Sequence, residues 1–258
     1  MIEFRDLHKG FGGRPVLRGI DLVVREGETL ALLGPSGTGK SVLLKHVVGL
    51  LEPDAGDVLV DGISIAQATD EELQRVRRRV GYVFQNAALF DSLTVAENLW
   101  LAQDDGRGSR SLAACRGEAI ELLRRVNLEP VVLEQRPAEL SGGMRKRVGV
   151  ARAIASRPSY LLWDEPTTGL DPVNADTVDE LILELGQGLG VTSIVVTHDL
   201  DTAFEVGDRI ALLYEGRIRA CEPPARILES PDPIVQRFVR RRRSSDVPDG
   251  PTAAALPG

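Results

Sequence analysis

At residues 34–41 the chain reads Gly34-Pro35-Ser36-Gly37-Thr38-Gly39-Lys40-Ser41. An apolar, β-rich segment at residues 28–33 precedes this stretch, and apolar residues recur at helical spacing over residues 41–48. The spacing G-x-x-x-x-G-K-[ST] between a strand and a helix is typical of a phosphate-binding loop. The stretch therefore predicts an α/β fold of the P-loop NTPase class, with ATP and Mg²⁺ as ligands.

Each residue type in this loop has a physical role toward a triphosphate. Glycines allow the loop to curl so that backbone N–H groups point inward, and the helix N-terminus adds favourable partial charge. Lys40 would place its charge between the β- and γ-phosphates, and the Ser41 hydroxyl would bind Mg²⁺. A glycine-rich turn without a ligand is the alternative, but such a turn does not require lysine and serine at these two positions.

Two adjacent carboxylates follow a second apolar strand, in the run Tyr160-Leu161-Leu162-Trp163-Asp164-Glu165. Neighbouring side chains on a strand point to opposite sides, so the two acids can take different tasks. We expect Asp164 in the metal shell and Glu165 beside the attacking water. Taken alone, the pair fits equally well a strand end before the turn at Pro166.

A histidine closes a third apolar segment, in Val195-Val196-Thr197-His198-Asp199. The carboxyl end of a strand in a parallel sheet is where ligands usually bind. We therefore predict that His198 contacts the γ-phosphate, although a single histidine is more often structural. His8 and His46 are interpreted as structural.

Composition sets the class of protein. The chain has 258 residues, 43% of them hydrophobic, which suffices for a substantial core. Its apolar runs are far shorter than the ~18 residues of a membrane span, and its first residues show no secretory leader. Cys115 and Cys221 are isolated, as in a reducing compartment. These features predict a cytoplasmic location.

The charge balance disfavours nucleic-acid partners. There are 31 basic and 38 acidic residues, giving a formal net charge of −7. Arg237 and the arginines at positions 240–243 form a basic cluster. This cluster suits anionic lipid headgroups or a partner, and it suits equally a solvated tail.

The remaining sequence separates into β-rich and helical parts. Strands are predicted near residues 2–7, 16–24, 58–60, 80–84, 210–214 and 217–220. Residues 86–158 are largely helical in pattern and are interpreted as a helical subdomain inserted into the α/β core. We expect one ATPase domain over residues 1–240 and a disordered C-terminal tail over residues 241–258.

The run Leu140-Ser141-Gly142-Gly143-Met144 lies upstream of the two carboxylates and begins a helix. With it, residues 1–240 resemble the nucleotide-binding subunits of ABC transporters, whose motifs occur here in the same order. The resemblance implies an ABC-type nucleotide-binding domain with an antiparallel β subdomain and a helical subdomain, hydrolysing ATP.

The resemblance also implies roles for further residues. In that family the Ser-Gly-Gly element binds the γ-phosphate of ATP held by a second subunit, so Ser141, Gly142 and Gly143 imply a head-to-tail homodimer. Phe11 falls where the family stacks an aromatic ring on adenine, or else it covers core. Gln85 falls at the Q-loop position, where its amide oxygen would reach Mg²⁺ or the attacking water.

Some departures from the common pattern indicate a branch of the family. Met144 stands where many relatives have glutamine, and Phe11 where tyrosine is commoner. Together with the sequences of residues 37–46, 84–98 and 167–173, these two departures make the chain resemble the ATPases of Mla/Mce-type phospholipid transporters. The implied partners are an integral membrane permease and Mce-domain or accessory proteins, with the chain on the cytoplasmic face of the inner membrane. The alternatives are an amino-acid importer ATPase and a non-transport ABC ATPase.

Overall fold

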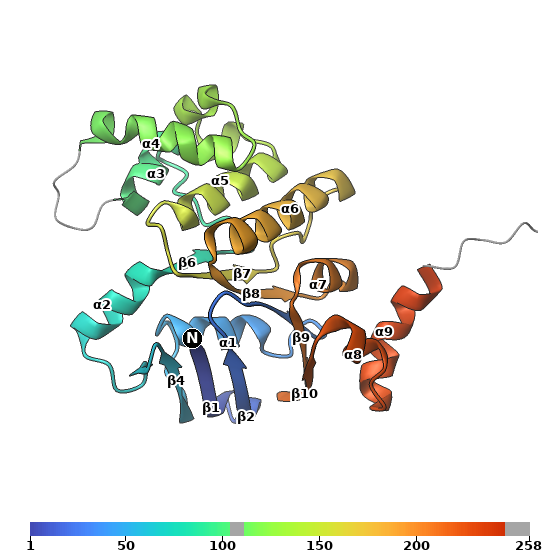
Figure 1. The fold of residues 1–258 in the computed structure, drawn as a ribbon. Coiled ribbons are helices and arrows are strands. Elements are labelled where there is room, and N and C mark those ends of the chain that lie inside the picture. Colours follow the sequence, from blue (N-terminus) through green and yellow to red (C-terminus); the bar gives the residue numbers. More distant parts are fainter. Residues whose placement is uncertain (104–110, 246–258) are drawn as a thin grey trace, which may run out of the picture.

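The computed structural model describes residues 1–103 and 111–245. Two β-sheets and the helices around them make up these residues (Figure 1). The mixture confirms the predicted α/β class with an antiparallel sheet and a helical region.

The larger sheet has the order β10-β9-β3-β8-β7-β6 and is parallel apart from the edge pair β10 and β9. Its strands are β3 (Thr29–Leu33), β6 (Val80–Val83), β7 (Tyr160–Asp164), β8 (Thr192–Thr197), β9 (Arg209–Tyr214) and β10 (Arg217–Glu222). The smaller sheet is antiparallel, with the order β2-β1-β4-β5. Its strands are β1 (Ile2–Phe11), β2 (Arg14–Val24), β4 (Ala55–Val60) and β5 (Ile63–Ser64).

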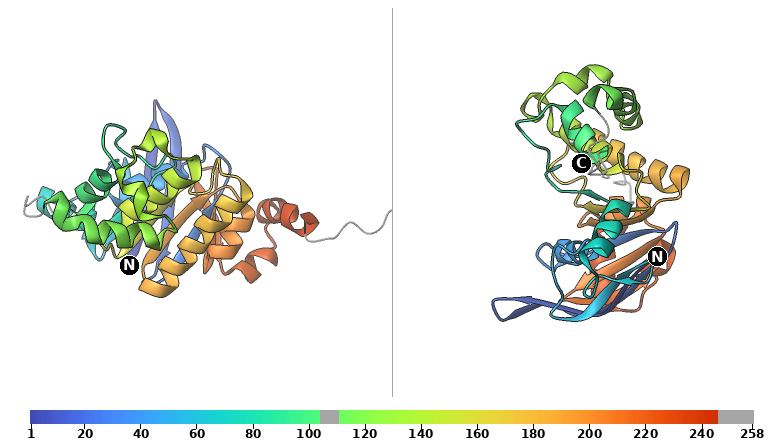
Figure 2. Two further views of the ribbon diagram at one scale, coloured as in Figure 1. Left: turned by 90° about the horizontal axis from the view of Figure 1, so that it is seen from above. Right: turned by 90° about the vertical axis from the view of Figure 1, so that its left-hand side faces the viewer.

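Helices connect and cover the sheets. They are α1 (Lys40–Val47), α2 (Asp70–Arg79), α3 (Val95–Gln103), α4 (Leu112–Arg125), α5 (Gly142–Ile154), α6 (Pro172–Leu189), α7 (Leu200–Val206), α8 (Pro224–Leu228) and α9 (Pro233–Ser245), with 3-10 turns at Pro130–Glu134 and Pro137–Glu139. Helices α3, α4 and α5 gather at one end of the molecule, and the antiparallel sheet lies at the other (Figures 1 and 2). The predicted helical stretch at residues 86–158 contains α3, α4 and α5.

The central strands β3, β7 and β8 of the larger sheet are buried at every residue, which explains why they are mostly apolar. Side chains alternate between the faces along β7. Leu161 and Trp163 pack with the helices on one side, whereas Tyr160 and Leu162 pack with α1 and the antiparallel sheet on the other. This two-sided core fixes the register of the strands, and hence the positions of their ends.

The structure differs from the sequence reading at two places. Helix α2 lies in a stretch for which no helix was predicted, and α9 continues to Ser245, so the boundary expected at residue 241 falls within a helix. Residues 246–258 of the expected tail lie outside the described residues. Within residues 1–103 and 111–245, no helix has the length and hydropathy needed to cross a bilayer.

Candidate nucleotide-binding and catalytic site

The predicted site residues follow the carboxyl ends of neighbouring parallel strands. Strand β3 ends before the glycine-rich loop, β7 ends at Asp164, β8 ends before His198 and β6 ends before Gln85. The ladder pairs Leu33 with Thr197, and Asp164 with Val196. The sheet therefore brings segments distant in sequence to one edge, where ligands bind in parallel α/β folds.

The glycine-rich loop is shaped by close packing. A Cβ atom on Gly34 would lie 2.3 Å from the carbonyl oxygen of Leu213 in β9. Gly39 has a φ of +101°, and a Cβ there would lie 2.7 Å from Cγ1 of Val16. Only glycine fits at these two positions, because one lacks space and the other also has a left-handed backbone.

Lys40 lies inside the curl of this loop. Its side chain is 5% exposed, and its ammonium donates to the carbonyls of Gly34 at 2.8 Å and Pro35 at 3.2 Å. It also lies 3.3 Å from Oε1 of Glu165. A positive charge is thus fixed in the loop and joined to the carboxylate at the end of β7.

Asp164 faces the start of α1. The Ser41 hydroxyl donates to its Oδ1 at 2.6 Å, and the Tyr82 hydroxyl donates to its Oδ2 at 3.2 Å. Burial of Tyr82 raises the pKa of its phenol, with the Asp164 charge adding to the effect, so Tyr82 remains a donor. A hydroxyl and a carboxylate are hard oxygen ligands, as Mg²⁺ prefers. Ser41 and Asp164 thus have the chemistry to hold this ion together with phosphate oxygens.

Glu165 carries the second carboxylate in a strained backbone. Its φ is +51°, in the left-handed region that costs a non-glycine residue about 1–2 kcal/mol. Its Oε2 accepts from the Thr168 hydroxyl at 3.0 Å and lies 2.7 Å from Nδ1 of His198. With Lys40 on the other oxygen, the carboxylate is held from both sides.

A cavity of about 450 Å³ lies over these groups. Its lining includes Phe11, Val16, Ser36, Gly37, Gly39, Lys40, Ser41, Gln85, Glu165, Thr168 and His198. Phe11 is 46% exposed, and the Lys9 ammonium lies 5.6 Å from the centroid of its ring. The ring is therefore available for stacking at the mouth of the cavity. Polar groups converge here on the phosphate loop, as expected of a ligand site.

Ser141, Gly142 and Gly143 lie elsewhere in the same chain. Ser141 caps α5 by accepting from the backbone N–H of Met144 at 3.2 Å. Ser141 and Gly142 are exposed, and none of the three residues lines the cavity around Lys40. The structure thus brings together the loop, the carboxylates, His198, Gln85 and Phe11, but leaves the exposed Ser141 and Gly142 outside this cavity.

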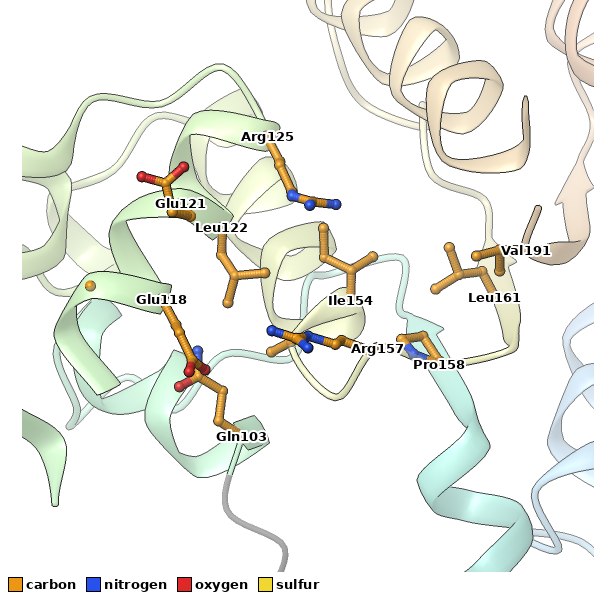
Figure 3. Close-up of a pocket in the computed structure, with 12 residues that line it drawn as sticks. Gln103, Glu118, Glu121, Leu122, Arg125, Ile154, Arg157, Pro158, Leu161 and Val191 are labelled. Atoms are coloured by element: carbon orange, nitrogen blue, oxygen red, sulfur yellow. The ribbon is translucent and has the colours of Figure 1, made fainter. Parts of the chain in front are cut away.

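A larger cavity, of about 730 Å³, lies away from the predicted residues. Helix α4 contributes Leu122 and Arg125, and Arg157 and Leu161 lie across from them (Figure 3). This cavity adjoins the amino end of β7, opposite to the end that carries Asp164. It holds no residue of the phosphate loop, so size alone does not identify the nucleotide site.

Several residues of the site had no individual role in the sequence reading. The Thr168 bond to Glu165, the Tyr82 bond to Asp164 and the position of Val16 beneath Gly39 are seen only in the structure. Lys146, on the helix that begins after Ser141, is buried and donates to the carbonyl of Pro166 at 2.9 Å. A threonine three residues after a strand-end acid is a usable signal, whereas the other contacts depend on tertiary packing.

A phosphate loop, a hydroxyl–carboxylate pair and a second carboxylate joined to histidine, at the carboxyl edge of a parallel sheet, define a P-loop nucleotide hydrolase. The family model of the ABC transporter matches residues 17–168, and the chain belongs to this family. It is an ATP-binding, ATP-hydrolysing subunit of an ABC transporter.

The relatives and the solved structures agree on the family, whereas the relatives differ in the substrate that their names give. The chain is 42% identical to the sulfate/thiosulfate import ATP-binding protein CysA of Caulobacter vibrioides over 90% of its length and 67% of the relative. It is 41% identical to the methionine import ATP-binding protein MetN of the same organism, covering 84% of the chain and 65% of the relative. It is 36% identical to the probable ribonucleotide transport ATP-binding protein mkl of Mycobacterium leprae, and the match covers 94% of the chain and 69% of the relative.

The chain thus spans about two thirds of the length of these curated relatives. A dimeric, post-hydrolysis structure of the ATP-binding cassette MJ0796 with ADP and phosphate matches with a TM-score of 0.80 and 35% identity. That match covers 87% of this chain and 99% of the cassette. Cassettes of this family form dimers, as that structure and a second dimeric structure of MJ0796 illustrate.

Proposed function

We propose that this ATPase drives an Mla/Mce-type permease that moves phospholipids or related lipids across the bacterial envelope. The observation that supports this cargo is the resemblance of Met144 and residues 84–98 to ATPases of that branch. The named substrates of the relatives are varied, so they favour no single cargo. Amino-acid import is the second candidate, and similarity to the methionine import protein supports it.

In the proposed reaction, Glu165 orients and polarises the water that attacks the γ-phosphate. The Thr168 and His198 contacts direct its carboxylate toward the cavity, which is the positioning that phosphoryl transfer requires. Because Nδ1 of His198 faces Glu165, Nε2 is the ring atom left to contact the γ-phosphate. In the imidazolium form, that atom would donate to a phosphate oxygen.

Lys40 and the phosphate loop would bind the β- and γ-phosphates, and Phe11 would stack on the adenine. Mg²⁺, when bound, neutralises charge on the phosphates, and we assign Ser41, Asp164 and Gln85 to its shell. The described residues contain no group of three or more histidine, cysteine, aspartate or glutamate side chains placed to hold a metal ion, so Asp164 is the one acidic side chain that we assign to this shell. Such a sparse protein shell suits Mg²⁺, which usually keeps waters and substrate phosphates among its ligands.

We further propose that the working unit is a head-to-tail homodimer. Ser141, Gly142 and Gly143 lie at the start of a helix and do not line the chain's own cavity, and Ser141 and Gly142 are exposed. A helix N-terminus with free N–H groups binds anions, so this turn would close over ATP on a second copy. The ATPase rate per chain should then rise with protein concentration.

The permease is proposed to bind at residues 86–98. Phe90 is 51% exposed there and lies beneath the Arg152 guanidinium, 5.2 Å from the ring centroid. Buried Asn98 fixes this segment by accepting from the Phe90 N–H at 2.8 Å and donating to the Thr94 carbonyl at 2.9 Å. A cavity of about 210 Å³, lined in part by Ala87 and Arg152, lies beside it.

We propose that the ATPase binds its permease through this surface and so lies on the cytoplasmic face of the inner membrane. Asp91 is exposed and suits a charge-reversal test of the surface. Glu97 does not, because its carboxylate accepts from the Thr94 N–H at 2.7 Å and so caps α3. Asp91→Lys with Phe90→Ala should abolish co-purification of the permease while leaving the ATPase of the isolated chain intact. An unchanged complex would place the permease elsewhere.

The cargo is tested by reconstitution with the permease that co-purifies with the chain. Proteoliposomes containing fluorescent phospholipid should show ATP-dependent lipid transfer, and a Glu165→Gln preparation should not. ATP-dependent uptake of an amino acid without lipid transfer would instead establish the importer. Co-purified ribosomes or DNA would indicate a non-transport ATPase.

A further inference from the structure

Lys146 is a buried cation on the helix that begins at Ser141. Its residue is 8% exposed, and its ammonium donates to the main-chain carbonyls of Pro166 at 2.9 Å and Glu165 at 3.3 Å. Within the described part of the chain, Lys146 forms no ion pair with a carboxylate. A buried charge is tolerated only when hydrogen bonds compensate it, so these two carbonyls determine where the ammonium lies.

One of the two bonds is made to the main chain of Glu165. Glu165 has a left-handed backbone, and its N–H donates to the Val196 carbonyl at 2.9 Å. Its carbonyl accepts from Lys146 and, at 3.3 Å, from the Thr168 N–H. A left-handed conformation in a non-glycine residue persists only where surrounding contacts stabilise it, and the hydrogen bond from Lys146 is one of these contacts.

The first turn of α5 also touches the far end of the same segment. A Cβ on Gly143 would lie 2.4 Å from Oδ1 of Asn174. The Asn174 amide in turn donates to Oδ2 of Asp171 at 2.6 Å. Helix α5 therefore contacts the segment from Glu165 to Asn174 at both ends.

We propose that Lys146 is a positioning residue for ATP hydrolysis: it holds the Glu165–Pro166 main chain so that the Glu165 carboxylate stays directed at the cavity. The inference rests on the proposed role of Glu165. The same helix presents Ser141 to the proposed second copy. Lys146 thus connects the turn that serves one ATP to the carboxylate that acts on the other.

The test compares Lys146→Met, which removes the donor, with Lys146→Gln, which keeps an N–H donor on a shorter side chain. Arg147→Met is the matched control, because Arg147 on the same helix donates to the Asn127 carbonyl at 2.8 Å, away from Glu165. Each variant is made in the wild-type and Glu165→Gln backgrounds. The readouts are kcat, the KM for ATP and the melting temperature of the full chain.

Lys146→Met should lower kcat about 10-fold or more with KM within about twofold, because small displacements of a catalytic group are costly. Lys146→Gln should lose less, about threefold, and Arg147→Met should keep kcat whatever its melting temperature. In the Glu165→Gln background neither Lys146 change should lower the residual rate further, since residues acting through one group are not additive.

A wild-type kcat in folded Lys146→Met, or an equal loss in Arg147→Met, would overturn the proposal. If Lys146→Met fails to fold, Lys146→Gln carries the test. An equal loss of kcat in the wild-type and Glu165→Gln backgrounds, or no loss of kcat in either background, refutes the positioning role. The proposed function fails separately: Glu165→Gln alone would then hydrolyse ATP at the wild-type rate.

Discussion

Replacing Glu165 by glutamine separates catalysis from binding at this site. The amide keeps the length of the side chain and one acceptor oxygen, but it removes the negative charge that lies 3.3 Å from the Lys40 ammonium. The amide nitrogen must then face either the Lys40 ammonium, which is paired with Oε1, or Nδ1 of His198, which lies 2.7 Å from Oε2. One of the contacts that hold this side chain is therefore lost with the charge.

We expect kcat to fall about 100-fold or more, equivalent to about 2.7 kcal/mol of transition-state stabilisation. ATP affinity should be unchanged or higher, because the substrate is a polyanion and a negative charge beside Lys40 has been removed. Phosphate release at saturating Mg²⁺-ATP gives kcat, and equilibrium dialysis with labelled ATP gives the affinity.

The matched control is Glu180→Gln, the same chemical change at an exposed position of α6. It should leave both quantities as in the wild type. A kcat for Glu165→Gln within about threefold of the wild type would refute the assignment of Glu165. A parallel loss of ATP affinity would show instead that the carboxylate supports the loop rather than the reaction.

Three further changes test other parts of the structure. Lys40→Ala should weaken ATP binding itself, measured by dialysis, and unchanged affinity would exclude the predicted phosphate contact. Gly34→Ala should lower the free energy of unfolding by about 1–3 kcal/mol and impair ATP binding, because its Cβ would meet the Leu213 carbonyl oxygen at 2.3 Å; denaturant titration checks this. Burial raises the pKa of Asp179 to about 6, so its folded form binds the proton more tightly and stability falls as pH rises toward and through that value. Asp179→Asn should remove this dependence and gain about 1 kcal/mol on the wild type between pH 5 and pH 8, whereas an equal difference at both pH values would contradict it.

The strands and the phosphate loop were predictable because local pattern and tertiary environment agree there. The central strands of the larger sheet are buried on both faces, so they read as short apolar runs. Gly34 and Gly39 are required by close packing, and the motif contains both glycines. Helix α2 was missed although its start carries a signal. The Thr69 hydroxyl caps the N–H of Glu72, and the Glu72 carboxylate returns to the Thr69 N–H, a capping box visible in the sequence.

The contacts that orient the catalytic groups were harder to predict from the sequence. Tyr82 reaches Asp164 because β6 and β7 are neighbours, with Tyr82 opposite Leu162 in the ladder. Lys146 reaches the Glu165 carbonyl only because tertiary packing brings α5 beside the segment that follows β7. Residue type does not reveal either contact, since a tyrosine in a strand and a lysine in a helix are ordinary choices.

The arrangement of α5 suggests why hydrolysis in such a subunit would depend on closure with a second copy. Ser141 lies exposed at the start of the helix, where it can meet an anion, while Lys146, about one and a half turns further along, is already bonded to the Glu165 and Pro166 carbonyls. Backbone hydrogen bonds join each turn of a helix to the next, so a displacement of one turn moves its neighbour. A shift of Ser141 when it binds ATP would therefore displace the Glu165 main chain. Removing the Lys146 donor should uncouple Ser141 from Glu165 while leaving both residues in place.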